Sequence, residues 1–515
     1  MSTHSVQPAS PDRAPFFVAL VLYTFALLPV IRADRDYIDD LGRALSGYMS
    51  WSGDGRPLAN LVMEVLNLGT PLTDLSPLPQ LLCAGLLAYL ASSIARRFEI
   101  RGAVLPALIC TPLLISPFYL ENLSYKFDAL TMTLAVFLAV QTVLTTRANM
   151  KAGVLGGLGL LAALCLYQPA LNAFLTFALV ELVVMQRQDR GVALIARTIC
   201  VRVLQLIAAL CLYTLIAART VKGGYSAEHG QIAPLGDLSE AAWRNLFAFW
   251  DYVLQALKSI MGGVLLSYIA IAVVIATVLS TRYAVRNWNT SSLHQRVLLV
   301  AIALCLPPLF AVAPWGPMLA LMQPTLMPRT MIGFGALAAA AGLILCVALP
   351  AGRRSDGWRI AIAALPAFAL LVFAQVYGNT LKLQKEYEDF MSRQISEDLV
   401  ASAPEGGFRQ YTLVGNAGRP PVAQHNLKKY PLLSLLVPIH LTENWGWAGV
   451  QLKHFGVSVP PIPASEALEE IADACTTTPI VRHVGYSIYS TGATAVVVLQ
   501  STSCESRTAT DHIRN

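Results

Sequence analysis

The chain has 515 residues, of which 55% are hydrophobic and only 13% are charged, and its mean hydropathy is +0.55. Soluble domains carry about 25% charged residues, so this composition excludes an ordinary soluble enzyme and favours an integral membrane protein. The net charge of +6 does not indicate a nucleic-acid partner, because the basic residues lie in short loops between apolar runs, which is the pattern of membrane topology.

Apolar runs of membrane-spanning length recur along the first three quarters of the chain, each close to the ~20 residues that a helix needs to cross ~30 Å of hydrocarbon. We read the first run as an uncleaved span, since a poor cleavage site follows it and only Arg13 precedes it. We predict eleven transmembrane helices, at residues 15–32, 78–95, 103–119, 127–145, 152–167, 169–186, 201–218, 262–280, 297–314, 331–350 and 359–377.

The Lys and Arg residues predict the orientation of these helices. With a cytoplasmic N-terminus, the inside segments hold 16 basic residues in 69, whereas the outside loops 33–77, 119–127, 219–261 and 315–330 hold 9 in 113. Cytoplasmic loops carry the excess of basic residues, so residues 33–77 and the C-terminal region are predicted to lie outside the cytoplasm. We therefore expect a multi-pass protein of the bacterial inner membrane.

Residues 380–515 differ in pattern from the membrane portion, residues 1–379. Leu381 to Val400 reads as an amphipathic helix, residues 410–414 and 494–500 as strands, and Ser465 to Cys475 as a capped helix. These features predict a small extracytoplasmic α/β domain. Its two cysteines, Cys475 and Cys504, predict a disulfide in an oxidising compartment, with two buried free thiols as the alternative.

The first outside loop concentrates acidic residues in a short segment. If it is helical, Asp36, Asp39, Asp40 and Arg43 share one face and apolar residues occupy the other, as in an interfacial helix. Carboxylates crowded against like charges and an apolar surface have a raised pKa, which suits a general base. The alternative is a solvated helix face on which Arg43 forms a helical salt bridge.

Polar residues also mark the other outside loops. Arg56 precedes a second predicted interfacial helix within residues 33–77, and can bind an anionic headgroup or simply snorkel. Asp128 can cap the fourth span or face a polar cavity. Glu121 and Lys126 lie at the same membrane depth as Asp128, and Gln168, at the third outside turn, is a polar group with no evident structural need. Arg329 is read first as a snorkelling arginine and second as a phosphate contact.

The residues from Asp36 to Arg43, the Gly55-Arg56-Pro57 motif, the run from Glu121 to Asp128 and the Tyr167-Gln168-Pro169 turn resemble the phage-type serotype-converting glucosyltransferases, which modify O-antigen. These are similar to the wider C-type glycosyltransferases, so the resemblance implies a GT-C-like membrane fold. It covers about residues 1–380.

The resemblance implies transfer of a sugar, such as glucose, from a polyprenyl-phosphate carrier to a lipopolysaccharide-type glycan on the periplasmic side. The base candidates are Asp39 and Asp40, followed by Asp36. Arg43, Arg56, Lys126 or Arg329 then stabilise the departing phosphate in place of a metal, and no cofactor is expected, although a metal role for the acids stays open. The implied partners are the lipid-linked donor, the glycan acceptor, the bilayer, and a companion flippase and donor-synthesising enzyme.

Two other functions compete with this one. A transporter or flippase of lipid-linked sugars would place acids inside the spans, near the middle of the membrane, whereas the polar residues here gather in the outside loops. A phosphoethanolamine or acyl transferase is the second rival, but a phosphoethanolamine enzyme would need metal ligands and a nucleophilic threonine in the exported domain, and no such set is visible.

Overall fold

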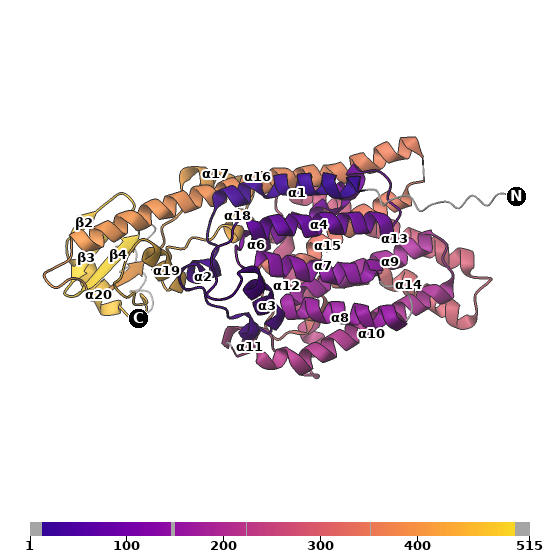
Figure 1. The fold of residues 1–515 in the computed structure, drawn as a ribbon, viewed down its shortest axis with the longest axis horizontal. Coiled ribbons are helices and arrows are strands. Elements are labelled where there is room, and N and C mark those ends of the chain that lie inside the picture. Colours follow the sequence, from indigo (N-terminus) through magenta and orange to yellow (C-terminus); the bar gives the residue numbers. More distant parts are fainter. Residues whose placement is uncertain (1–12, 146–149, 223, 351, 500–515) are drawn as a thin grey trace. The chain divides into compact units, whose positions relative to one another are not determined.

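The computed structural model describes residues 13–145, 150–222, 224–350 and 352–499 (Figure 1). The chain forms two compact units. The helical unit comprises residues up to 31, 49–69 and 75–375, and the α/β unit comprises residues 32–48, 70–74 and 376 onward. Parts of the first outside loop, residues 32–48 and 70–74, are thus grouped with the C-terminal residues.

The helical unit is a bundle of apolar helices, several of which run side by side in Figure 1. Each of the eleven predicted spans coincides with one of them: α1 (Ala14–Ala33), α4 (Leu78–Arg97), α5 (Val104–Leu114), α7 (Ala129–Thr145), α8 (Met150–Leu166), α9 (Leu171–Arg187), α10 (Val192–Ile216), α13 (Ile260–Asn287), α14 (Leu293–Val312), α15 (Ile332–Ala348) and α16 (Arg353–Ala401).

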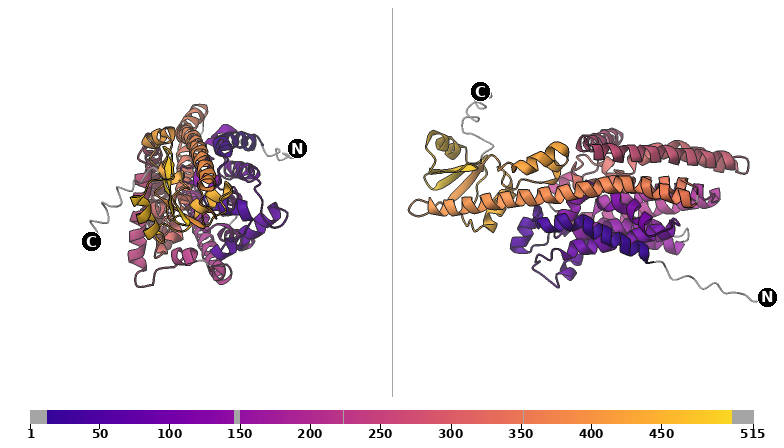
Figure 2. Two further views of the ribbon diagram at one scale, coloured as in Figure 1. Left: turned by 90° about the vertical axis from the view of Figure 1, so that its left-hand side faces the viewer. Right: turned by 90° about the horizontal axis from the view of Figure 1, so that it is seen from above.

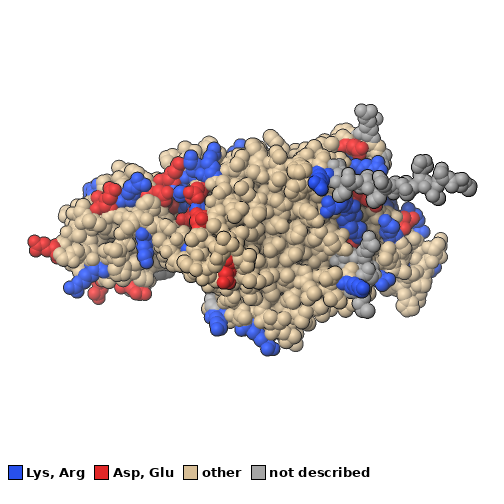
Figure 3. All heavy atoms as spheres, in the orientation of Figure 1, with Lys and Arg blue, Asp and Glu red and all other residues tan. Residues whose placement is uncertain are grey.

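Seven of the described helical segments are long and apolar enough to cross a membrane, and the chain is accordingly a helical membrane protein. The four other predicted spans correspond to apolar helices of 10–17 residues, so eleven crossings stay a prediction. Figure 3 shows a broad uncharged surface over the bundle, with Lys and Arg side chains gathered beyond one end of it. This distribution is the one that a bilayer requires, because charged groups are costly in hydrocarbon.

Helix α15 packs against α5, α9 and α13 and is buried over most of its length. Its small residues allow this close approach. A Cβ atom on Gly333 would lie 2.0 Å from the Pro314 carbonyl oxygen, and one on Gly335 would lie 2.9 Å from the Pro112 carbonyl oxygen. Small residues at such contacts are typical of helix packing in membranes, where backbone proximity replaces the hydrophobic effect.

The other described helices of this unit are short, apart from α12. They are η1 (Trp51–Asp54), α3 (Pro57–Leu66), α6 (Tyr119–Ser124), η2 (Gln168–Ala170), η3 (Ala218–Thr220), α11 (Gly224–His229), α12 (Leu238–Ala256), η4 (Gly316–Ala320) and η5 (Pro328–Thr330). The predicted second interfacial helix is α3, which begins with Pro57 directly after Arg56, as expected for proline in the first turn.

The α/β unit contains a four-stranded sheet in the order β1-β4-β3-β2. Its elements are β1 (Gln410–Val414), β2 (Val481–Arg482), β3 (Tyr486–Thr491), β4 (Thr494–Leu499), and the helices α2 (Asp39–Ser46), α17 (Pro421–Lys429), α18 (Leu433–Leu436), α19 (Gly446–His454) and α20 (Leu468–Thr476). Strands β1 and β4 are parallel, and the other pairs are antiparallel. Both predicted strands are present.

Two local predictions for this unit need correction. The amphipathic helix expected from Leu381 is not separate, because α16 continues without a break from Arg353 to Ala401, as Figure 2 shows. The helix expected from Ser465 begins instead at Leu468, with Ala467 as its N-cap residue and without a side-chain cap hydrogen bond. Cys504 lies outside the described residues, so its disulfide with Cys475 stays a prediction.

Candidate active site

A cluster of charged and aromatic side chains forms at one end of the helical unit. It contains residues that the sequence singles out, namely Arg56, Glu121, Lys126, Asp128 and, from η5, Arg329. Glu121, Lys126 and Asp128 are almost entirely buried, with exposures of 3%, 7% and 3%. Buried charges are costly unless paired, so the contacts among these groups decide what the cluster can do.

Asp128 lies directly before α7 and holds the first part of the cluster together. Its Oδ1 accepts a 2.6 Å hydrogen bond from Trp51 Nε1 and lies 3.9 Å from Arg56 Nη1. Gly55 permits this approach of the loop, since it adopts a φ of 73° and a Cβ there would lie 2.5 Å from the Tyr213 hydroxyl. Asp128 therefore contacts the indole of Trp51 and the guanidinium of Arg56.

Glu121 and Arg329 form the second part. Glu121 Oε2 accepts a 2.6 Å hydrogen bond from the Arg329 backbone N–H, and Oε1 lies 3.5 Å from Arg329 Nη1. The same Nη1 donates to the Tyr125 hydroxyl at 2.9 Å. Arg329 is therefore held by protein groups, which differs from the freely snorkelling arginine that the sequence alone allows.

Tyr167 joins the two parts. Its ring centroid lies 4.7 Å from Cζ of Arg56, a cation–π distance, and its hydroxyl donates to the Arg329 carbonyl oxygen at 2.8 Å. The same carbonyl accepts from Asn122 Nδ2 at 3.1 Å. The sequence motif that contains Tyr167 gives this residue no role, because aromatic residues at a membrane interface are common.

Gln168 has a clear structural role. Its Nε2 donates to the Asp54 carbonyl oxygen at 3.0 Å and to the Tyr213 hydroxyl at 2.7 Å. It thereby ties the turn before α9 to the loop that carries Arg56. The sequence offered no structural reason for a glutamine here, since both partners are distant along the chain.

The two arginines remain accessible despite these contacts. The side chains of Arg56 and Arg329 are 23% and 22% exposed, and Arg56 Nε has no hydrogen-bond partner among the described residues. Guanidinium groups held in this way can bind the oxygens of a phosphate. No group of three or more His, Cys, Asp or Glu side chains suited to a metal occurs within the described ranges.

The acidic segment of the first loop belongs to the α/β unit. Helix α2 begins at Asp39, so Asp36 precedes the helix. The prediction that Asp36 shares one helix face with Asp39 and Asp40 is therefore wrong. Asp40 and Arg43 are buried, which excludes a plain solvated face, and the Tyr37 backbone N–H donates to Asp40 Oδ2 at 3.1 Å. The helix ends at Gly47, whose φ of 62° favours glycine.

Contacts with the C-terminal residues fix α2 in place. The Leu41 carbonyl oxygen lies 2.9 Å from His454 Nε2, and the Tyr37 hydroxyl donates to the Leu436 carbonyl oxygen at 2.9 Å. Ile38, just before the two aspartates, has a φ of 52°. A β-branched residue in this region is strained by ~1–3 kcal/mol, and strain of this kind is often retained at functional sites.

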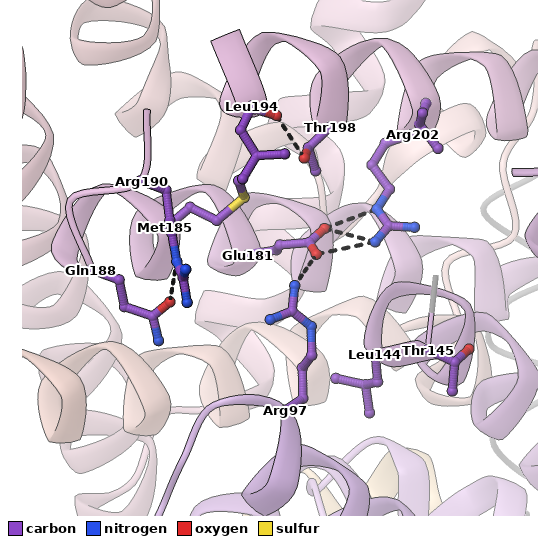
Figure 4. Close-up of a pocket in the computed structure, with 11 residues that line it drawn as sticks. Arg97, Leu144, Thr145, Glu181, Met185, Gln188, Arg190, Leu194, Thr198 and Arg202 are labelled. Carbon is purple, nitrogen blue, oxygen red and sulfur yellow. Dashed lines mark hydrogen bonds and ion pairs between the residues drawn. The ribbon is translucent and has the colours of Figure 1, made fainter. Parts of the chain in front are cut away.

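A second polar site lies at the opposite end of the bundle, since α7 separates Asp128 from Thr145 by about 25 Å of helix at 1.5 Å per residue. Here a cavity of about 730 Å³ is lined by Arg97, Glu181 and Arg202 among others. Figure 4 shows the Glu181 carboxylate between the two guanidinium groups. Arg202 donates to both carboxylate oxygens, at 2.9 and 3.1 Å, and Arg97 donates to Oε1 at 2.6 Å.

Comparisons with known proteins agree with the resemblance seen in the sequence. Residues 28–340 match the family of the glucosyl transferase GtrII. The chain is also 27% identical over 444 residues to a protein of Salmonella phage P22, described as an uncharacterized 55.3 kDa protein in the gtrB 5' region, with 85% of this chain and 88% of that protein covered. No solved structure matches. Because the family match covers more than half of the chain, including every residue of the cluster, this protein belongs to the GtrII glucosyltransferase family.

Proposed function

We propose that this glycosyltransferase moves glucose from a polyprenyl-phosphate carrier to an O-antigen or similar surface glycan on the periplasmic side of the inner membrane. The observation that carries the proposal is the cluster around Arg56 and Arg329, in which two accessible guanidinium groups are anchored by the buried carboxylates of Asp128 and Glu121. A lipid-linked donor presents its phosphate at a membrane surface, where such a cluster can bind it.

The proposed reaction forms one bond and breaks one. A carboxylate takes the proton of an acceptor hydroxyl, whose oxygen then attacks the anomeric carbon of the donor sugar. The bond from that carbon to the phosphate oxygen breaks, and polyprenyl phosphate leaves with the electron pair. Negative charge grows on the leaving phosphate, so fixed cations stabilise the transition state more than the ground state.

We assign the leaving phosphate to Arg56 and Arg329, with Lys126 as a further cation. Tyr167 and Glu121 act as positioning residues, because they orient the two guanidinium groups through the stacking and hydrogen bonds described above. Preorganised donors are effective because they need no rearrangement as the reaction proceeds.

For the general base we propose Asp39 or Asp40, then Asp36, with Arg43 as a second phosphate-binding group. Two observations support a defined geometry for Asp39 and Asp40: the strained Ile38 directly precedes them, and α2 is hydrogen-bonded to the C-terminal residues. The proposal also includes the lipid bilayer, a flippase that delivers the donor and an enzyme that makes it.

The test uses the purified protein in detergent with radiolabelled polyprenyl-phosphate glucose and a panel of glycans. We expect label to reach the glycan, and we expect Asp39→Asn or Asp40→Asn to abolish transfer without changing the thermal midpoint. If both variants and Asp36→Asn kept full activity, the base assignment would be wrong. If the wild-type protein transferred no sugar from any polyprenyl-phosphate donor, the proposed function would be wrong.

The predicted sidedness has its own test. Alkaline phosphatase fused after residue 499 should be active, because this enzyme needs an oxidising periplasm to form its disulfides. The same fusion in the loop after Arg97 should be inactive. Reversed activities would contradict the proposed orientation.

One observation favours a flippase of lipid-linked sugars as a second candidate. Glu181 and Arg202 are buried beside the 730 Å³ cavity at one end of the bundle, and charges buried among membrane helices often mark transport pathways. Reconstituted vesicles loaded with a fluorescent polyprenyl-phosphate sugar distinguish the two functions. Movement between leaflets without glycosyl transfer would favour the flippase.

A further inference from the structure

The α/β unit contains a cavity of about 220 Å³ that the reaction outlined above does not use. It is lined by Arg35 and Asp36 of the first loop, by Asp389 of α16, and by His440 and Phe455. One buried water needs only ~10–15 Å³ of such space, whereas pockets for drug-sized ligands have ~300–1,000 Å³. The cavity therefore has room for a ligand of about one sugar ring.

Arg35, which lines this cavity, has buried hydrogen-bond donors without a partner in the described part of the chain. Its Nη2 donates to Glu388 Oε2 at 2.6 Å and to the Pro438 carbonyl oxygen at 2.9 Å. Nε and Nη1 are buried and have no hydrogen-bond partner among the described residues. The side chain is only 3% exposed, so bulk water does not satisfy these donors either. Unsatisfied buried donors cost ~1–3 kcal/mol each, and more on a charged group, so this arginine favours a ligand that supplies acceptors.

His440 offers the complementary group. Its Nδ1 lies 3.3 Å from Gln451 Oε1, and Gln451 Nε2 is directed to Asp389 Oδ1, also at 3.3 Å. Because Gln451 Oε1 can only accept, Nδ1 carries the imidazole proton. Burial, followed by the nearby Arg35 charge, lowers the pKa of His440 well below 6.5, so the ring is neutral. Its Nε2 is then a bare acceptor, buried and without a partner in the described part of the chain.

The ligand must therefore accept from Arg35 and donate to His440. A fully ionised phosphate ester or a carboxylate can accept but has no proton to donate, and a metal cation cannot satisfy Arg35. A hydroxyl does both at once, and a ring carrying several hydroxyls matches a cavity with donors and acceptors on different walls. The phenyl ring of Phe455 adds an apolar wall, which suits the C–H face of a sugar.

We propose that this cavity binds one hexose ring of the acceptor glycan. The assignment of the cavity to the acceptor rather than the donor rests on the proposed function. It follows from Asp36, which lines the cavity and belongs to the same segment as Asp39 and Asp40, the residues proposed as base. A general base must lie within hydrogen-bond reach of the acceptor hydroxyl, directly or through one water. A subsite on the acid-bearing segment would hold the acceptor, and not the lipid phosphate, near that base.

The experiment measures saturation-transfer NMR between the full-length protein in detergent and methyl glycosides of glucose, galactose, mannose and rhamnose. We expect at least one glycoside to show transfer that falls at least tenfold in His440→Asn, which keeps a polar group near Nδ1 and removes the acceptor at Nε2. His440→Gln places an amide oxygen near the Nε2 position and should retain part of the signal. His425→Asn, on the exposed face of α17, is the matched control and should bind as the wild type does.

Phe455→Ala is a second variant that removes only the apolar wall, and it should weaken binding even if His440→Asn fails to fold. The inference is overturned if no glycoside shows transfer with the wild-type protein, if the signal survives in both His440→Asn and Phe455→Ala, or if inorganic phosphate displaces the glycoside.

A parallel transferase assay separates the two proposals. Unchanged acceptor KM in His440→Asn would overturn the acceptor subsite while the transferase function stands. Glycoside binding that depends on His440, in a wild-type protein that transfers no sugar, would support the sugar site and refute the proposed function.

Discussion

Replacing Glu121 by glutamine tests whether its pair with Arg329 sets the geometry of the site. Glutamine keeps the shape of the side chain and one carbonyl oxygen for the Arg329 backbone N–H, so the substitution removes mainly the negative charge that faces Nη1 at 3.5 Å. A hydrogen bond to a charged group contributes ~1.5–3 kcal/mol. The 22% exposure of Arg329 and the length of the contact favour the lower end of this range.

A loss of ~1.4 kcal/mol in transition-state stabilisation corresponds to about a tenfold fall in kcat/KM. We therefore expect Glu121→Gln to transfer glucose from polyprenyl-phosphate glucose about tenfold less efficiently, with a similar amount of folded protein. Glu64→Gln is the matched control, because Glu64 is exposed on α3 in the same unit and outside the cluster. It should behave as the wild type does.

The double variant makes the test specific to the pair. Arg329→Gln alone should lower kcat/KM more strongly, since it removes a proposed phosphate ligand. The variant with both substitutions should lose little more than Arg329→Gln alone, because the two residues share one interaction. Full activity of Glu121→Gln, or losses that simply multiply in the double variant, would refute the reasoning.

Three further predictions concern packing and charge. Arg56→Lys keeps the charge but loses the planar stack on Tyr167, so kcat/KM should fall about tenfold; an unchanged value in the transfer assay would contradict a positioned guanidinium. Glu181→Leu leaves the Arg202 guanidinium buried without its carboxylate and should destabilise the protein by ~3–5 kcal/mol, visible as a lower thermal midpoint in detergent; no shift would show that the pair is dispensable. Because the pKa of His440 is lowered in the folded state, the unfolded state binds more protons, and the contribution of this residue to stability is lost as the pH falls below about 6.5. The thermal midpoint should drop less steeply between pH 6.5 and 5 in His440→Asn than in the wild type, and equal slopes would argue against a buried neutral imidazole.

Much of the fold followed from local patterns. The apolar runs located the bundle helices because each run reports the length and burial of its own segment. Strands β1 and β4 were predicted because their β-branched and apolar residues form a compact run. The boundaries were less certain, as α10 begins at Val192 rather than residue 201 and α16 continues far beyond residue 377. Helices extend past apolar segments wherever hydrogen bonds and packing permit, and hydropathy does not register that extension.

The sequence by itself determined that this is a helical membrane protein, that its polar residues gather in a few loops, and that the motifs in those loops are those of a glucosyltransferase. Only the tertiary structure decided how the residues combine. It paired Glu121 with Arg329, about 200 positions away along the chain, stacked Arg56 on Tyr167, and assigned the acidic segment at α2 to the same unit as the C-terminal sheet. The physical reason is that periodicity and composition report on neighbours within a few turns of helix, whereas the electrostatics of a site depend on side chains that meet only when distant segments pack together.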